Sequence, residues 1–370
     1  MKFSVERDSL LATLSHAHRI VARTSDVPIL TTILLSATAG RVEIKATSTE
    51  LVAETACPAE IEAGGQVAVP LAPLVELLRR LSAGTPLTFS LGEGGEGLTI
   101  RYRRSSATLP TLAAQEFSAF DMVGEAVELE VSATDLARLL ETPVHVADPQ
   151  SPWAFGVGVH LHFSAIDAAL VGVATDQRRL TRIMLPAPDG AAGLPPITLA
   201  TKPISEIVKL ARDVGPEPLR LRITERLMSI AAGTTVLTTK LVDTRFPDYS
   251  RVIPSEMPRT AIVAAGELTA ALQRTLVLAD DKDRTVKCEI ADGILSLNMR
   301  GQKGGSINET IEVEGGEGIV FGINASRAVE ALAAIDADLI ELASASPTAP
   351  VVMRAAKAPT VTCIVMPLLV

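Results

Sequence analysis

The stretch FSVERDSLLATLSHAHRI, at residues 3–20, decides the fold, because a short apolar strand runs directly into an amphipathic helix. Its leucines recur at three- and four-residue spacing, which lines one face of a helix. The same opening returns as LEVSATDLARLLETPVHV at residues 129–146 and AIVAAGELTAALQRTLVL at residues 261–278. These starts lie roughly 125 to 135 residues apart, a typical domain size. The repeat therefore predicts three similar domains, at residues 1–125, 126–252 and 253–370.

Each predicted domain also contains a second strand followed by a helix. The three copies are QVAVPLAPLVELLRRL (66–81), PITLATKPISEIVKLA (196–211) and GIVFGINASRAVEALAAI (318–335). Three runs that read as strands follow each helix, and apolar and polar residues alternate in LTIRYR (98–103), LRLRI (219–223) and LSLNM (295–299). This alternation is typical of half-buried antiparallel strands. Hairpin turns are indicated between the strands by GEGGEG at 92–97 and by Asp292-Gly293.

The chain thus reads as an α+β protein in which one βαβββ unit occurs six times, two units in each domain. Hairpin connections predict antiparallel sheets, with the helices packed on one face only. The six helices would therefore all lie on one side of the sheets.

Composition places the chain among ordinary globular proteins. It has 370 residues, of which 47% are hydrophobic and 21% charged. No apolar run approaches the ~20 residues of a membrane helix, and charges interrupt the N-terminus where a signal peptide would be apolar. Cys57, Cys288 and Cys363 form no C-x-x-C pair. We therefore expect a reduced, cytoplasmic protein without structural zinc.

The net charge of −9 is unusual for a protein that would grip nucleic acid. The predicted helices nevertheless carry a modest excess of cations. These are Arg23, Arg79, Arg80, Arg138, Lys202, Lys209, Arg212 and Arg274. One interpretation is a set of solvated helix faces with intrahelical ion pairs. The other is a weakly positive surface that attracts DNA phosphates without immobilising the protein.

Catalytic and cofactor motifs are not evident. The sequence has no G-x-x-x-x-G-K-[ST] motif, so GEGGEG and Gly304-Gly305 are interpreted as turns. His160 and His162 have a spacing compatible with a metal, but no third ligand adjoins them. Asp176 is interpreted as structural. We therefore expect no enzyme activity, no metal and no cofactor.

Five segments resemble signature stretches of the bacterial DNA polymerase III β subunit, the β sliding clamp, in family order along the whole chain. They are MKFSVERDSLL (1–11), VPILTTILL (27–35), ATDQRRL (174–180), LVDTRFPDYSRVIP (241–254) and IVMPLLV (364–370). The resemblance implies the DNA-clamp fold and a head-to-tail homodimer. Its six domains would form a ring around duplex DNA of any sequence, with the antiparallel sheets outside and the helices lining the ring. Such a protein would be cytoplasmic and associated with the nucleoid.

The resemblance also implies a dimer interface between the first domain of one subunit and the third domain of the other. The matching residues are Arg101, Arg103, Arg104, Val277, Leu278, Glu309 and Glu312. Basic and acidic edges would then face each other, although GQKGGSINE (301–309) is poorer in acids than is usual in the family.

A hydrophobic pocket between the second and third domains is the other site that the resemblance implies. Its partners would be the clamp loader, the polymerase α subunit, and other polymerases and repair proteins with clamp-binding motifs. An apolar groove with Met and Pro in its wall and Arg at its rim suits varied peptides. The matching residues are Thr175, Gln177, Arg178, Arg179, Leu180, Pro247, Arg251, Val252, Ile364, Val365, Met366, Pro367 and Leu368.

The chain departs from the family pattern around this pocket. Gln177 and Arg178 replace a usual Gly-His pair, and Leu369 replaces an arginine. SPWAFGVGVHLHF (151–163) replaces a tyrosine-bearing stretch, so the equivalent strand offers Trp153 or Phe155. Two functions therefore stay open: a DNA-encircling clamp, main or accessory, and a peptide-binding scaffold of the same fold without ring closure or DNA engagement.

Overall fold

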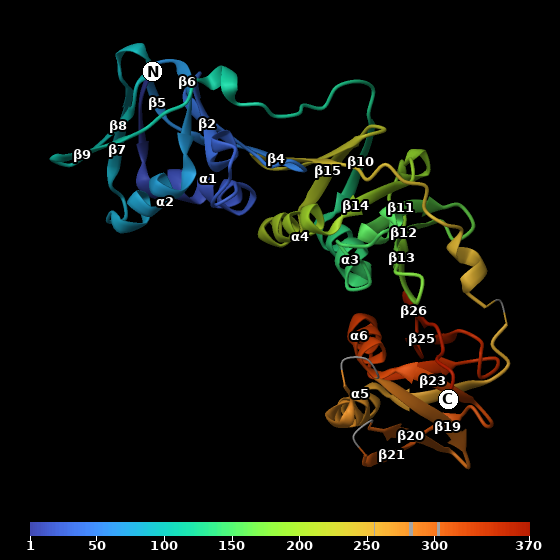
Figure 1. Ribbon diagram of the computed structural model, residues 1–370. Coiled ribbons are helices and arrows are strands. Elements are labelled where there is room, and N and C mark those ends of the chain that lie inside the picture. Colours follow the sequence, from blue (N-terminus) through green and yellow to red (C-terminus); the bar gives the residue numbers. More distant parts are fainter. Residues whose placement is uncertain (255, 281–283, 302–303) are drawn as a thin grey trace. The chain divides into compact units, whose positions relative to one another are not determined.

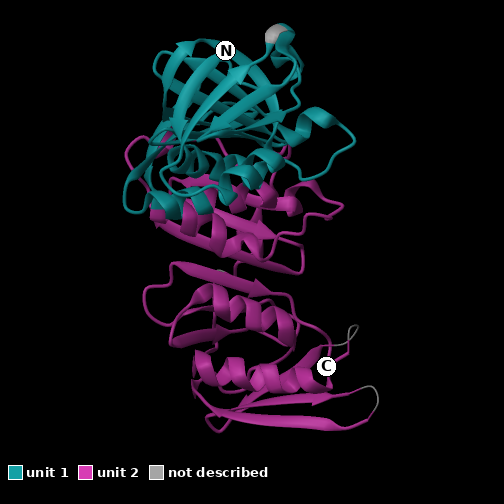
Figure 2. Cartoon of the chain, turned by 90° about the vertical axis from the view of Figure 1, so that its left-hand side faces the viewer, with its two compact units in different colours: residues 1–133, 209–241 teal, residues 134–208, 242–370 magenta. Residues whose placement is uncertain are grey.

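The computed structural model describes residues 1–254, 256–280, 284–301 and 304–370. Figure 2 shows two compact units. Unit 1 comprises Met1–Ala133 and Lys209–Leu241, and unit 2 comprises Thr134–Val208 and Val242–Val370. Both are built from antiparallel sheets and helices, which confirms the predicted α+β class.

The βαβββ unit occurs six times in the described residues, as predicted (Figure 1). The first third contains β1 (Lys2–Glu6), α1 (Arg7–Ile20), β2 (Thr32–Thr38), β3 (Arg41–Thr47), β4 (Leu51–Pro58), then β6 (Gly65–Pro70), α2 (Leu71–Arg80), β7 (Pro86–Leu91), β8 (Leu98–Tyr102) and β9 (Ser105–Leu109). The middle third contains β10 (Val127–Ser132), α3 (Ala133–Val144), β11 (Gly158–Ser164), β12 (Ala169–Thr175), β13 (Arg179–Pro186), then β14 (Ile197–Ala200), α4 (Thr201–Val214), β15 (Pro218–Ile223), β16 (Leu227–Ala232) and β17 (Thr235–Lys240). The last third contains β18 (Thr260–Ala264), α5 (Ala265–Thr275), β19 (Thr285–Ala291), β20 (Ile294–Arg300), β21 (Ser306–Glu312), then β23 (Val320–Asn324), α6 (Ala325–Ile335), β24 (Leu339–Ala343), β25 (Val351–Ala355) and β26 (Val361–Val365). Two short strands, β5 (Glu60–Ala63) and β22 (Glu314–Gly315), are additions to the repeat.

Unit 1 contains two sheets and the helices that cover them. Its strand orders are β5-β1-β7-β8-β9 and β10-β15-β16-β17-β4-β3-β2-β6. Helix α1 packs on β3 and β4 and beside α2, with Leu10 and Leu14 of α1 fully buried. Leucines at helical spacing are thus among the core residues of this unit, as their periodicity predicts.

Unit 2 contains a nine-stranded and a four-stranded sheet. The orders are β14-β11-β12-β13-β26-β25-β24-β18-β22 and β21-β20-β19-β23. Strand β26 lies between β13 and β25, where Ile364 is opposite Leu180 on one side and Val352 on the other. Helices α5 and α6 pack together (Figure 1). The middle and last thirds of the chain therefore share one continuous sheet.

Turn chemistry explains where two strands end. Asp292 and Gly293 join β19 to β20 with φ of 54° and 73°, the doubly positive pattern of a tight hairpin turn, as predicted. The strand predicted at 98–103 ends one residue early, at Tyr102. Arg103 has φ of 53° and forms the turn into β9 with Arg104.

The compact units do not follow the predicted domain limits. Strand β17 pairs with β4, and β13 pairs with β26, so adjacent thirds are hydrogen-bonded across the limits. The three-domain division at 125/126 and 252/253 stays a prediction.

The cysteines at positions 57, 288 and 363 are buried free thiols. Among the described residues, no helix is both long and apolar enough to span a membrane.

Candidate functional site

A surface cavity of about 520 Å³ in unit 2 is the candidate site. It lies where β12, β13 and β26 meet the segment at residues 246–252. Its lining residues are Phe155, Thr175, Gln177, Arg179, Leu180, Pro247, Asp248, Tyr249, Arg251, Val252, Pro350, Ile364 and Met366.

The floor of the cavity belongs to an apolar cluster that spans five neighbouring strands. Its buried members are Val173, Leu180, Ala343, Val352 and Ile364, one each from β12, β13, β24, β25 and β26. Phe246 and Tyr249 pack against this cluster and lie over the sheet. Because the cluster depends on the β13–β26 pairing, the cavity exists only where the two thirds of the chain join.

The loop between β12 and β13 is held by its own hydrogen bonds. The Thr175 hydroxyl donates to the Arg179 carbonyl at 2.9 Å. Asp176 Oδ1 accepts the N–H groups of Arg178 at 2.9 Å and Arg179 at 2.8 Å. Gln177 adopts φ of 70°, in the left-handed region. Asp176 therefore has the structural role expected from the sequence.

Arg179 connects the cavity wall to α6. Its guanidinium donates to Asp176 Oδ2 at 3.1 Å and to the His145 carbonyl at 3.1 Å, and it also pairs with the Glu330 carboxylate. Burial and the positive charge of Arg179 lower the pKa of the His145 imidazole. The two carboxylates neutralise this cation, so Arg179 shapes the wall more than it attracts ligands.

The segment after β26 forms another part of the wall. The Met366 N–H donates to the Arg178 carbonyl at 2.8 Å, and the Leu368 N–H donates to the Gly322 carbonyl at 2.9 Å. A Cβ on Gly322 would lie 2.4 Å from the Leu368 oxygen, so only glycine admits this segment without a shift. These two anchors place Met366 at the cavity.

Nine of the thirteen residues expected in the pocket line the cavity. The other four are Arg178, Val365, Pro367 and Leu368. Arg178 is exposed and contributes its carbonyl to the Met366 anchor. Val365 is buried, because neighbours along a strand point to opposite faces and Ile364 faces the cavity. Leu368 pairs with Gly322.

Four lining residues were not in the expected set: Phe155, Asp248, Tyr249 and Pro350. Asp248 and Tyr249 lie within the RFPDY motif, so the motif itself was the signal. Phe155 was considered together with Trp153 as a strand residue, but both precede β11, at the 3-10 helix Ala154–Val157. The sequence gives no comparable signal for Pro350.

The eight cations expected to face DNA are all exposed. Partial burial and the charges of Arg79 and Arg23 lower the pKa of His18. Both arginines therefore lie near His18. Arg274 is different, since its guanidinium donates to both Glu309 carboxylate oxygens, at 2.9 and 2.6 Å. Arg274, expected to face DNA, is thus paired with Glu309, expected at the dimer interface.

The expected dimer residues lie on or beside two sheet edges. Arg101 is on β8, and Arg103 and Arg104 form the turn before the edge strand β9. Glu309 and Glu312 are on the edge strand β21, while Val277 and Leu278 lie in the 3-10 helix Leu276–Leu278, with Val277 77% exposed. In GQKGGSINE, residues 302–303 lie outside the described residues.

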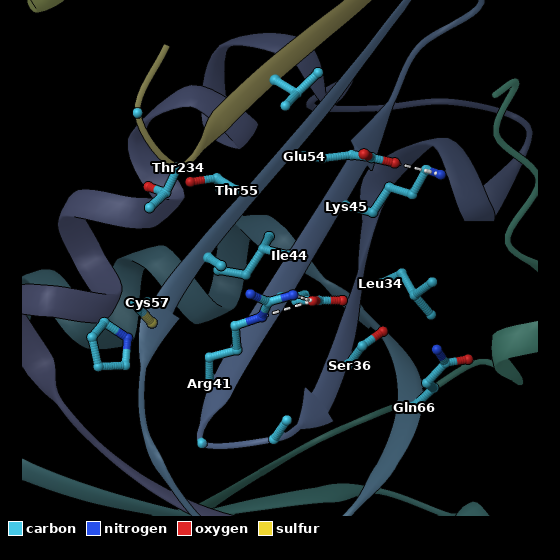
Figure 3. A pocket seen from close by; sticks show the side chains of 17 residues that line it. Leu34, Ser36, Arg41, Ile44, Lys45, Glu54, Thr55, Cys57, Gln66 and Thr234 are labelled. Atoms are coloured by element: carbon cyan, nitrogen blue, oxygen red, sulfur yellow. Dashed lines mark hydrogen bonds and ion pairs between the residues drawn. The ribbon is translucent and has the colours of Figure 1, made fainter. Parts of the chain in front are cut away.

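A larger hollow of about 780 Å³ lies on the eight-stranded sheet of unit 1 (Figure 3). Among its lining residues the cations are Arg41 and Lys45. Arg41 Nε donates to Glu43 at 2.8 Å, and Lys45 lies 2.6 Å from Glu54 and 2.5 Å from Asp121. Partial burial would lower the pKa of Lys45, but the hydrogen bonds with Asp121 and Glu54 raise it. These charges compensate one another, so we assign the functional site to unit 2.

Three family models match the chain in succession. The N-terminal, central and C-terminal domains of the DNA polymerase III beta subunit match residues 1–121, 130–248 and 250–369. A beta sliding clamp from Caulobacter vibrioides is 30% identical over 100% of both chains, and one from Proteus mirabilis is 28% identical over 92% of each.

Solved structures agree with the family models. A Caulobacter crescentus β sliding clamp, with polyethylene glycol at its proposed β-motif tethering region, has a TM-score of 0.94 at 30% identity over 100% of both chains. A Bartonella birtlesii sliding clamp bound to griselimycin has a TM-score of 0.92 at 27% identity, also over 100% of both.

These clamps are non-catalytic subunits of the replicative polymerase, in line with the expectation that the sequence encodes no enzyme. The repeat, the sheet order and the full-length matches lead to one assignment. The chain belongs to the DNA polymerase III beta subunit family, the bacterial sliding clamps.

Proposed function

We propose that this sliding clamp acts as a head-to-tail homodimer that closes around duplex DNA and tethers replication proteins through the cavity of unit 2. The observation that carries the tethering is the apolar floor of that cavity, formed by the Leu180–Ile364 pairing. An open apolar hollow with a few polar groups at its rim suits a short peptide. The expected partners are the clamp loader, the polymerase α subunit and repair proteins with clamp-binding motifs.

Tethering can be tested with a labelled apolar peptide from the host's replicative polymerase, by fluorescence polarisation. Deleting residues 366–370 removes Met366 from the wall and both backbone anchors. A buried apolar side chain contributes ~1.5–3 kcal/mol, and 1.4 kcal/mol is about tenfold in affinity. We expect at least tenfold weaker binding, while Leu369→Ser, at a 91% exposed side chain, leaves the affinity unchanged. Equal affinity of the deletion variant and the intact protein would place the docking site elsewhere.

Ring closure is supported by two sheet edges of opposite charge. Arg103 and Arg104 form the turn that leads into the edge strand β9, and the edge strand β21 carries Glu309 and Glu312. A heterologous contact closes into a ring when its rotation divides the circle. The native mass should be near twice the 38.9 kDa subunit. Charge reversal at both Arg103 and Arg104 should favour monomers. Once loaded, the protein should stay on nicked circular DNA and slide off the same DNA after linearisation.

The alternative is a peptide-binding scaffold that does not close around DNA, and the Arg274–Glu309 ion pair favours it. Glu309, one of the two acids expected on the β21 edge, is paired with Arg274 of the same chain and is thus less available to a second subunit. A monomer at tens of micromolar that still binds the polymerase peptide would establish the scaffold. Retention on circular DNA only would establish the clamp.

A further inference from the structure

Two histidines next to the cavity have no part in the function described so far. His160 and His162 lie on one face of β11, with ring centroids 5.5 Å apart. His160 stacks on Phe246 at 4.4 Å and 8°, and its Nδ1 lies 3.0 Å from the Thr198 hydroxyl. Both rings therefore face the segment that covers the sheet beside the cavity.

The hydrogen bonds of His162 determine which of its nitrogens carries the proton. Nδ1 lies 3.1 Å from the Phe163 carbonyl oxygen, and Nε2 lies 2.8 Å from the Tyr249 hydroxyl. A carbonyl oxygen only accepts, so Nδ1 is the donor in the neutral imidazole. Nε2 is then the acceptor, and the Tyr249 hydroxyl donates to it.

We propose that His162 is a positioning residue that fixes the Tyr249 ring by accepting the hydrogen bond of the Tyr249 hydroxyl. That hydroxyl then has no proton to donate to the ligand, so Tyr249 presents an apolar face to the cavity. The apolar anchor of the proposed tethering peptide, Leu or Phe, would then lie against Tyr249. An amide or carboxylate there would lose its water without gaining a donor. This choice of ligand rests on the proposed peptide tethering, whereas the hydrogen-bond assignment does not.

The imidazoles also support the rest of the aromatic wall. Phe246 contacts Tyr249 edge to face at 6.2 Å and Phe155 at 6.1 Å, both at 77°. Tyr249 and Phe155 line the cavity, and Phe246, between them, is stacked on His160. Loss of the His162 bond would release one end of this aromatic chain.

The hydrogen-bond assignment can be tested without any peptide. Long-range ¹H–¹⁵N spectra of the full-length protein with ¹⁵N-labelled histidine, near pH 7.5, distinguish the two tautomers. We expect the Nδ1–H form for His162, identified by the signal that His162→Gln removes. An Nε2–H form would overturn the proposal, because the Tyr249 proton would then be free for the ligand.

The specificity is tested with two peptides that differ only by Leu or Asn at the anchor. We expect the intact protein to prefer Leu by at least tenfold. The side-chain carbonyl of Gln can accept the hydrogen bond of the Tyr249 hydroxyl. His162→Gln should therefore keep the preference for the Leu peptide within about twofold of that of the intact protein. His162→Leu has no acceptor, so it should weaken binding of the Leu peptide and lower the ratio of Leu-peptide to Asn-peptide affinity. In a Tyr249→Phe background, which lacks the hydroxyl, His162→Leu should change neither affinity further.

Equal ratios of Leu-peptide to Asn-peptide affinity in His162→Gln and His162→Leu would overturn the positioning role. A side chain that only fills space would give that result, because it needs no hydrogen-bond acceptor. Circular dichroism melting checks that each variant folds. If neither peptide binds the intact protein, the tethering proposal fails, while the tautomer spectra still decide the His162–Tyr249 assignment.

Discussion

At the scale of single residues, His160 makes folding sensitive to pH. Burial and the neighbouring His162 lower its pKa to about 4, whereas an exposed histidine has about 6.5. As the pH falls below about 6.5, the unfolded chain binds a proton before the folded chain does. The free energy of unfolding is therefore highest above that pH and falls until about pH 4, by roughly 3 kcal/mol at most.

Urea unfolding between pH 7.5 and 4.5 measures this effect. His160→Phe keeps a ring against Phe246 and removes the titrating group. The intact protein should lose more stability over this range than His160→Phe, and the difference should grow mainly below pH 6.5. Parallel pH profiles of the two proteins would contradict the assignment.

Gln177 carries backbone strain that the usual family glycine would relieve. Its φ of 70° costs a side-chain-bearing residue about 1–2 kcal/mol relative to glycine. Gln177→Gly should therefore raise the free energy of unfolding by about 1 kcal/mol. The matched control is Arg178→Gly, whose backbone is not in that region, and it should lower the stability by about 0.5–1 kcal/mol. Urea midpoints compare both variants with the intact protein.

The sequence could predict the site by motif but not by side-chain direction. The run from Ile364 to Leu368 was expected to act together, yet Val365 and Leu368 do not line the cavity. Strand alternation accounts for Val365. The bridge to Gly322 accounts for Leu368, and it depends on a non-local pairing that no local pattern encodes.

At the scale of elements, the segment after β26 is positioned by β23. Gly322→Ala would bring a Cβ to 2.4 Å from the Leu368 oxygen and 2.5 Å from a Val370 methyl carbon, so the segment must shift. We expect Met366 to leave the wall and peptide affinity to fall several-fold, in the fluorescence polarisation assay.

Gly266→Ala is the control for that substitution. Gly266 lies in the first turn of α5, and a Cβ there meets nothing within 4 Å. This variant should bind the peptide as the intact protein does. If Gly322→Ala also binds normally, Met366 does not depend on the β23 anchor.

Helices and strands were predictable because each has a local period. Leu10 and Leu14 show the helical period, and Asp292-Gly293 marks a hairpin. The pairings of β17 with β4 and of β13 with β26 were not predictable, because they join strands that are far apart in the sequence. The pairing of β13 with β26 nevertheless creates the cavity floor.

At the scale of the whole molecule, the acidic chain should bind duplex DNA weakly and without sequence preference. Lys202, Lys209 and Arg212 are exposed on α4. Each cation that neutralises one phosphate contributes about 0.9 to the slope of log affinity against log salt. Replacing all three by Ala should reduce that slope by up to about 3 and weaken binding at low salt. Anisotropy titrations of labelled duplex at several salt concentrations measure it.

Arg274→Gln provides the comparison in the same titrations. Its guanidinium is already paired with Glu309, so its loss should change the slope less than the loss of the exposed Lys202. Equal effects would mean that the ion pair opens when DNA binds. Tight binding to one particular sequence would contradict phosphate-based attraction altogether.

The place of β26 in the sheet has a consequence for synthesis on the ribosome. In chain order it is the last strand of the nine-stranded sheet, yet it lies between β13 and β25. Until it is made, both neighbours expose an unpaired backbone edge, which invites association with other chains. A half-made chain is therefore expected to attract chaperones rather than replication partners, because Leu180 and Ile364 have not yet met. Translation itself thus delays docking until the sheet is closed.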